Sequence, residues 1–76
     1  MVDKQTEQSS LSWEASFEIA KHLEREHPNQ VLENVSLKDI FNWTVALPEF
    51  RDDQELANDD ILSAIYQEWY EEKEEL

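Results

Sequence analysis

Residues 42–60 have the sequence NWTVALPEFRDDQELANDD, and this stretch ends one predicted helix and begins the next. One face of the first of these helices has residues at positions i, i+3, i+4 and i+7, namely Ile40, Trp43, Thr44 and Leu47. Pro48 ends that helix, because a proline disfavours the helical conformation of the residue before it. Asn58 is a favourable N-cap for the following helix. The stretch therefore predicts two helices joined by a carboxylate-rich loop that Phe50 anchors to the core.

Two further boundaries complete the helical pattern. Ser36 and Asp39 form a capping-box-like start for the helix that precedes Pro48, since each side chain can accept a hydrogen bond from the other's backbone N–H. Residues 13–27 form a first helix, which ends before Pro28. The helix after residue 58 has one predicted buried face: Ile61, Leu62, Ile65 and Trp69.

No segment has the alternating pattern of a strand, so the predicted fold class is all-α, a small three-helix domain. Each helix supplies one tryptophan, and all three are expected to pack in the core: Trp13, Trp43 and Trp69. Trp13 is expected to be the most exposed of them, because it stands at the start of its helix. The aromatic side chains matter here, since a chain of this size buries only about 60% of its unfolded surface.

Residues 1–11 are predicted to be a disordered leader, because the first ten are polar apart from Met1 and Val2, and the folded domain is predicted to span residues 12–76. The absence of cysteine excludes disulfides and thiolate-bound zinc, and no bound iron–sulphur cluster is expected. No apolar run is long enough to cross a bilayer or to form a signal peptide. These features predict a cytoplasmic protein.

Charge restricts the expected partners most strongly. The chain has 19 acids and 6 bases, which give a formal net charge of −13. Nucleic acids and anionic membranes bind proteins through lysines and arginines, so this chain is expected to bind neither. Its expected partners are cations or basic protein surfaces.

Five acids in and after the central loop form a candidate metal site: Glu49, Asp52, Asp53, Asp59 and Asp60. Carboxylate oxygens suit hard cations such as Fe³⁺ and, less selectively, Fe²⁺. An EF-hand calcium loop is excluded, because the chain has no glycine and lacks the regular ligand spacing. The sequence therefore predicts at most a weak oxygen-ligand site, for which Mn²⁺ and Ca²⁺ are also candidates. A solvated acidic face, with helix capping by the last two of these acids, is the alternative interpretation.

Two other kinds of site are disfavoured. His22 and His27 are five positions apart and do not share a helix face as an i, i+4 pair does, so we interpret them as helix-surface residues. Paired carboxylates such as Asp52 and Asp53 could act in acid–base catalysis, but so small a core leaves little room for a water-excluding pocket. No nucleophile–base arrangement or phosphate loop is present. We therefore do not expect an enzyme.

The three tryptophans, taken with LPEFRDD at residues 47–53 and ANDDILSAI at residues 57–65, have a spacing that resembles the IscX family of iron–sulphur cluster assembly proteins. The resemblance runs from Trp13 to about Glu72 and implies a helical fold like a modified winged helix. The sequence departs from the family pattern at three positions where acids are usual: Asn29, Val31 and Arg51.

The resemblance implies an acidic adaptor that regulates cluster assembly, binds a cysteine desulfurase in competition with a frataxin-like protein, and binds iron weakly through surface carboxylates. We expect a monomer that electrostatic attraction steers onto the desulfurase. The expected contact residues are Glu49, Arg51, Asp52, Asp53, Asp59, Asp60, Glu68, Glu71 and Glu72. Two alternatives stay open, namely an iron-binding carrier or sensor, and a nucleic-acid-mimicking inhibitor of a basic protein.

Overall fold

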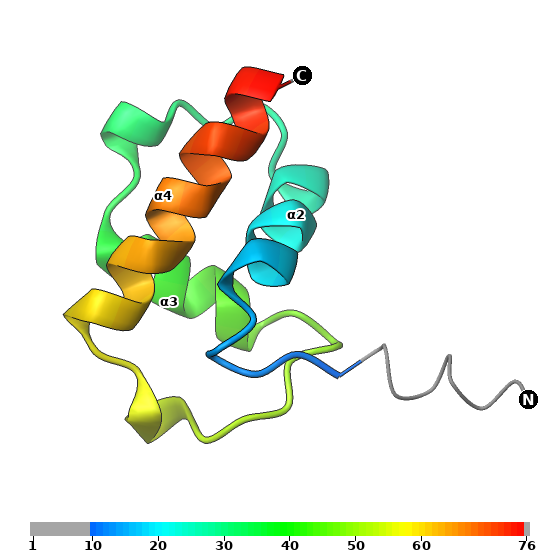
Figure 1. The fold of residues 1–76 in the computed structure, drawn as a ribbon, viewed down its shortest axis with the longest axis vertical. Helices are drawn as coiled ribbons and strands as arrows, with labels where there is room; N and C mark the ends of the chain where they lie inside the picture. The colour runs from blue at the N-terminus through cyan, green and yellow to red at the C-terminus, as the bar shows by residue number, and fades with distance from the viewer. Residues whose placement is uncertain (1–9, 76) are drawn as a thin grey trace, which may run out of the picture.

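The computed structural model describes residues 10–75 and contains three α-helices (Figure 1). These are α2 (Ser16–Glu26), α3 (Leu37–Val45) and α4 (Asp59–Glu75), with two short 3-10 helices, η1 (Leu32–Asn34) and η2 (Gln54–Leu56). The longest helix, α4, packs against both of the others and most extensively against α2. The predicted all-α domain of three helices is confirmed. Among the described residues, the segment between α3 and α4 contains the 3-10 helix η2 and one residue of an isolated β-bridge, and it forms no strand.

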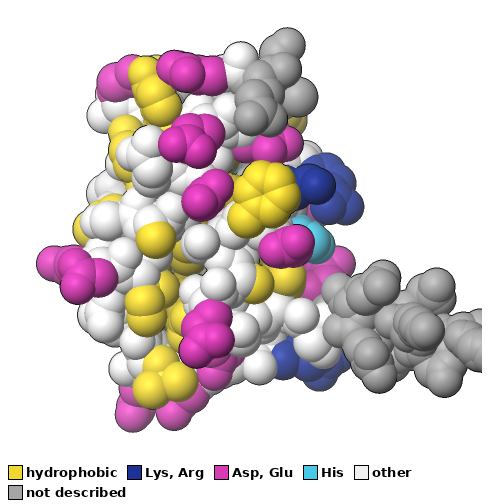
Figure 2. All heavy atoms as spheres, viewed as in Figure 1, with side chains coloured by type: hydrophobic (Ala, Val, Ile, Leu, Met, Phe, Trp, Pro, Cys, Tyr) yellow, Lys and Arg dark blue, Asp and Glu magenta, His cyan; other side chains and the backbone are white. Residues whose placement is uncertain are grey.

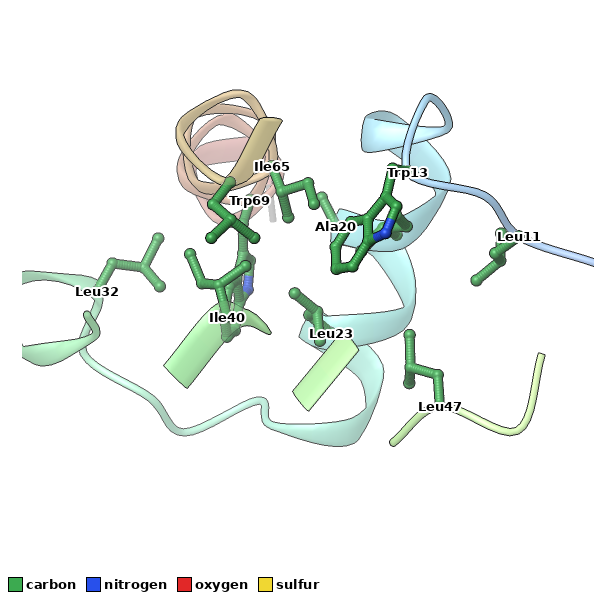
Figure 3. Close-up of a cluster of buried hydrophobic side chains, with 11 residues drawn as sticks. Leu11, Trp13, Ala20, Leu23, Leu32, Ile40, Leu47, Ile65 and Trp69 are labelled. Carbon is green, nitrogen blue, oxygen red and sulfur yellow. The ribbon is translucent and has the colours of Figure 1, made fainter. Parts of the chain in front are cut away.

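The core lies between the three helices (Figure 3). It also includes residues from the segment before α2 and from the connections between the helices. Among the residues that the structure describes, eleven hydrophobic ones are buried: Leu11, Trp13, Ile19, Ala20, Leu23, Leu32, Ile40, Leu47, Leu62, Ile65 and Trp69. The predicted apolar faces of α2, α3 and α4 all contribute to this set. Burial of such side chains contributes about 1.5–3 kcal/mol each, which is how so short a chain holds its helices together.

The most exposed of the three tryptophans is not the one expected from the sequence. Trp13 is only 3% exposed and Trp69 is fully buried, whereas Trp43 is the partly exposed one. The prediction for Trp13 is wrong because α2 begins at Ser16, three residues later than predicted. Trp13 lies in the turn before the helix, where its ring stacks on Phe41 at 5.9 Å between ring centroids and meets Phe50 edge-on at 4.7 Å.

The segment before Trp13 belongs to the folded domain. Leu11 is 3% exposed and pairs with the loop after α3, since its N–H donates to the Glu49 carbonyl and its carbonyl accepts from the Arg51 N–H, both at 2.8 Å. This pairing forms the isolated parallel bridge between Leu11 and Phe50. The ordered domain therefore includes Leu11, one residue earlier than predicted. Residues 1–9 of the predicted leader lie outside the described residues.

The predicted helix starts at Ser36 and Asn58 are confirmed. Ser36 and Asp39 form a complete capping box, in which each side chain accepts a 3.1 Å hydrogen bond from the other's backbone N–H. At the start of α4, the Asn58 side-chain oxygen accepts from the Ile61 N–H at 2.8 Å. Such caps satisfy backbone donors that a helix leaves free at its first turn, so both helices begin where the local sequence dictates.

A carboxylate on α2 fastens α4 to the rest of the fold. Glu24 Oε1 accepts a hydrogen bond from the Trp69 indole N–H at 2.9 Å and forms an ion pair with Lys73 Nζ, also at 2.9 Å. Lys73 also donates to the carbonyl of Pro28 at 3.1 Å. The Glu24 side chain is only 14% exposed, so these contacts lie largely away from water. Hence Glu24 fixes α4 against α2 through two successive turns of the longer helix.

Thr44 is fully buried, and its Oγ1 has no hydrogen-bond partner among residues 10–75. A buried hydroxyl without a partner costs about 1–3 kcal/mol. The Thr44→Val variant keeps the shape of the side chain and removes the hydroxyl, so we expect its free energy of unfolding to rise by about 1 kcal/mol. Urea denaturation followed by circular dichroism measures this change. A variant less stable than the wild type would contradict the assignment of an unsatisfied hydroxyl.

Candidate functional site

The predicted acidic loop wraps around one end of the molecule. The connection between α3 and α4 runs past the N-terminal segment and then across to the first turn of α4 (Figure 1). It carries three of the five candidate metal ligands, Glu49, Asp52 and Asp53, and the candidate contact residue Arg51, whose side chain is exposed. The structure assigns these residues different surroundings, which decide what each can do.

Asp52 and Asp53 hold the fold together as well as contributing charge. The two Asp52 carboxylate oxygens accept separate backbone hydrogen bonds, Oδ2 from the Trp13 N–H at 3.0 Å and Oδ1 from the Asp53 N–H at 2.7 Å. Asp53 caps η2 by accepting from the Glu55 N–H at 3.0 Å, and its carbonyl accepts from the Trp13 indole N–H at 2.8 Å. The Asp52 carboxylate therefore attaches the loop to Trp13, and the Asp53 carboxylate caps η2 within the loop.

Glu49 faces α2 rather than the other predicted ligands. Its Oε2 lies 4.0 Å from His22 Nε2, while His22 Nδ1 is 2.9 Å from the Glu18 carbonyl one turn earlier in α2. His27 is directed elsewhere, because its ring stacks on Trp43 with 4.4 Å between the ring centroids. The two histidines thus contact different groups, as their five-residue separation suggested, and Glu49 is the one candidate ligand recorded beside a histidine.

Asp59 and Asp60 are exposed in the first turn of α4, where the positive end of the helix dipole favours them. The five predicted metal ligands are not brought together. Within residues 10–75, no group of three or more histidine, cysteine, aspartate or glutamate side chains is placed to hold a metal ion. Nothing in the described part of the chain therefore constitutes a preformed iron site.

The remaining predicted contact residues lie toward the other end of α4. Glu71 is exposed, and Glu68 and Glu72 are partly exposed. At 1.5 Å of rise per residue, Glu72 is about 20 Å along the helix from Asp59, so the predicted contact residues form two groups and not one patch. Gln67 donates to the Glu71 carboxylate at 3.0 Å, which holds that side chain along the helix.

The C-terminal half of α4 has a negative local potential. The negative charge of the Glu74 carboxylate raises the pKa of Tyr70 above its ordinary value, because it disfavours the phenolate. The Glu33 carboxylate raises this pKa further. Figure 2 shows that carboxylates are spread over the face around α4, while the lysine and arginine side chains lie toward one edge of this view. A cation or basic surface would therefore be attracted to this face.

One structural residue that sequence reasoning missed is Glu24, which holds both Trp69 and Lys73. No local signal could have identified it, since its partners on α4 stand 45 or more positions further along the chain. In sequence, Glu24 is one of several acids on α2, and its burial becomes visible only when α4 lies across that helix.

Fold and site together define a class of protein, namely a small, strongly acidic three-helix domain with exposed carboxylates along one long helix. Among the residues that the structure describes, none of the helices has the length and apolar character needed to span a membrane.

Comparison with known proteins identifies the family. A family model described as iron-sulphur cluster assembly matches residues 11–74. An uncharacterized protein of Pseudomonas aeruginosa is 37% identical over 65 residues, which cover 86% of this chain and 98% of that protein. The chain belongs to the IscX family of iron–sulphur cluster assembly proteins, which confirms the predicted family and places its role in cluster assembly. This is a family of small helical proteins and not a known family of enzymes.

Proposed function

We propose that the protein is an acidic adaptor that regulates iron–sulphur cluster assembly by docking onto a basic patch of a cysteine desulfurase. The observation that carries this proposal is the net charge of −13 in a protein of the cluster assembly family, with exposed carboxylates along α4 among the described residues. Charges of one sign on a rigid surface speed association with an oppositely charged partner and orient it.

The docking residues that the geometry favours are acids of α4 that, in the described part of the chain, form no hydrogen bond or ion pair outside their own helix. Glu68, Glu71 and Glu72 lie on the C-terminal half of α4, and Asp59 and Asp60 lie at its start. Arg51 is exposed beside the acidic loop and could pair with an acid on the partner, which would fix the orientation of the complex.

Regulation follows if docking excludes another protein from the same surface. A frataxin-like protein that uses the same basic patch would compete with this adaptor, so the ratio of the two proteins would set the output of the desulfurase. Such competition needs no chemistry from the adaptor itself, in keeping with the family it belongs to.

An iron carrier or sensor is the weaker candidate. Within the described residues no three potential ligands converge, so a cation held by a pair such as Asp59 and Asp60 would keep most of its waters. Binding of that kind is weak, in the range of about 10⁻⁴ to 10⁻³ M found for the loosest oxygen-ligand calcium sites.

Salt and charge removal test the proposed docking. Affinity for the desulfurase, measured by calorimetry, is expected to fall at least about tenfold between about 0.01 M and 0.15 M salt, as the screening length drops from about 30 to 8 Å. The triple variant Glu68→Gln/Glu71→Gln/Glu72→Gln is expected to bind about tenfold more weakly than the wild type at low salt.

The matched control is Glu14→Gln/Glu18→Gln/Glu55→Gln, which removes the same charge from exposed positions outside α4. Its affinity is expected to fall by no more than about threefold, because only the long-range attraction is reduced. Salt-independent binding would contradict electrostatic docking. Equal losses in the two triple variants would contradict the assignment of the docking residues to α4.

A further inference from the structure

The C-terminal ends of α2 and α3 border an open hollow of about 180 Å³, which we call the Trp43 hollow. Its lining is mostly apolar, with one carboxylate and one imidazole: Glu26, His27, Trp43, Ala46, Leu47 and Pro48. Ligand pockets for whole small molecules have volumes of about 300 Å³ or more, whereas about 150 Å³ accommodates a single ring. The Trp43 hollow therefore has the size to take one side chain of a partner.

Trp43 is held rigidly although it is the least buried of the three tryptophans. His27 stacks on its ring with 4.4 Å between centroids and an interplanar angle of 22°, and Trp69 contacts it edge-on at 6.0 Å. Trp69 is in turn fixed by Glu24. A tryptophan presented in one orientation loses little entropy on binding, and residues of this type dominate the energy of protein interfaces.

Glu26 gives the hollow a charged rim. The residue is exposed, and neither of the two ion pairs recorded among residues 10–75 involves it. The floor is apolar, with Leu47 buried beneath Ala46 and Pro48, which are exposed. An apolar floor with a carboxylate at its rim complements an amphipathic cation, whose aliphatic stem can pack while its charged end meets the acid.

We infer that the Trp43 hollow receives one arginine side chain from the surface on which the protein docks. The arginine stem packs over Leu47 and Pro48, and its guanidinium pairs with Glu26 beside the Trp43 ring. Arginine fits better than lysine, because its planar group can meet a carboxylate through two hydrogen bonds and can stack on an aromatic ring. The choice of the desulfurase as the partner rests on the proposed function, whereas the preference of the hollow for an arginine side chain rests on its own lining.

The desulfurase complex provides one test of the hollow. Ala46→Phe fills it from an exposed position on its rim, and Glu26→Gln removes only the rim charge. Each variant is expected to bind the desulfurase roughly tenfold more weakly than the wild type, the loss expected for a close charge pair at an interface. Glu55→Gln, an exposed acid on η2, is the charge-matched control and is expected to lose no more than about twofold.

A second test needs no desulfurase. N-acetylarginine amide and N-acetyllysine amide are titrated against the full chain at equal ionic strength, and the indole N–H signals are followed by NMR, with Trp43→Phe used for assignment. The arginine compound is expected to shift the Trp43 indole signal saturably and more than the lysine compound. Ala46→Phe is expected to abolish this shift, with an unchanged circular dichroism spectrum showing that the variant is folded.

The two tests separate the hollow from the proposed function. Desulfurase binding that Ala46→Phe leaves at wild-type strength would overturn the inference and leave electrostatic docking standing. A saturable arginine shift without any desulfurase binding would support the hollow and overturn the proposed partner. Arginine-induced shifts spread evenly over the acids of α4, with none at Trp43, would overturn the inference.

Discussion

Glu24→Ala is expected to lower the free energy of unfolding by about 3 kcal/mol, because it leaves a buried indole donor and a partly buried ammonium without their shared acceptor. Trp69 and Lys73 both contact Glu24 Oε1 at 2.9 Å, and Trp69 is fully buried. A domain of this kind has a total stability of about 5–15 kcal/mol, so the loss is a large fraction of it. Chemical denaturation followed by tryptophan fluorescence measures the change.

Two further variants show which contact matters. Glu26→Ala, on the same helix but exposed, is expected to change stability by no more than about 0.5 kcal/mol. Glu24→Gln keeps an oxygen acceptor for the Trp69 indole and loses the ion pair with Lys73, so it should lie between the wild type and Glu24→Ala. If Glu24→Ala were as stable as Glu26→Ala, α4 would not depend on this contact.

Asp52→Ala is expected to cost about 2–3 kcal/mol, because each carboxylate oxygen accepts one backbone hydrogen bond and bonds to charged acceptors are the stronger kind. One of these bonds, from the Trp13 N–H at 3.0 Å, joins segments 39 positions apart in sequence. Its loss should detach the loop from Trp13 and change the fluorescence of that buried ring. Thermal unfolding and the emission spectrum together check the prediction.

The control for Asp52→Ala is Asp60→Ala, which removes the same charge from an exposed position in the first turn of α4. Only the interaction with the helix dipole is lost there, so the expected cost is about 0.3–1 kcal/mol. An equal effect of the two variants would mean that charge alone, and not the two hydrogen bonds, accounts for the role of Asp52.

The position of Asp52 also bears on iron. A cation that took this carboxylate as a ligand would compete with the Trp13 and Asp53 backbone donors, which already use both of its oxygens. Iron binding at Asp52 would therefore weaken the attachment of the loop, whereas binding at Asp59 or Asp60 would not. For the same reason, an Asp52→Asn/Asp53→Asn variant would report on the fold as well as on docking, and substitutions on α4 test docking more directly.

Much of the fold could be predicted from the sequence because the relevant interactions are local. Amphipathic spacing predicts α3 and the buried face of α4. The cap at Ser36 follows from Asp39 three positions later, and the cap at Asn58 follows from the residue type. The start of α2 was predicted too early, because Trp13 has the spacing of a helical residue but packs from a turn against Phe41 and Phe50. Side chains distant in sequence decided its position.

The candidate site could be predicted as a composition but not as a geometry. The five proposed metal ligands are close in sequence, yet backbone hydrogen bonds use two of them, one faces α2, and two are exposed at the start of α4. Proximity along a chain does not make carboxylates converge when the loop between them is extended over one end of the molecule.

The amino-acid sequence by itself determined the three-helix class, the helix caps, the net charge of −13 and the likeness to the cluster assembly family, since each depends on residue types or on short spacings. Only the tertiary structure decided which tryptophan is exposed, which acids are free to meet a partner, and that Glu24 holds α4. Those outcomes depend on contacts between residues 28 to 49 positions apart, which form only when the helices pack and bring distant side chains into a shared, low-dielectric interior.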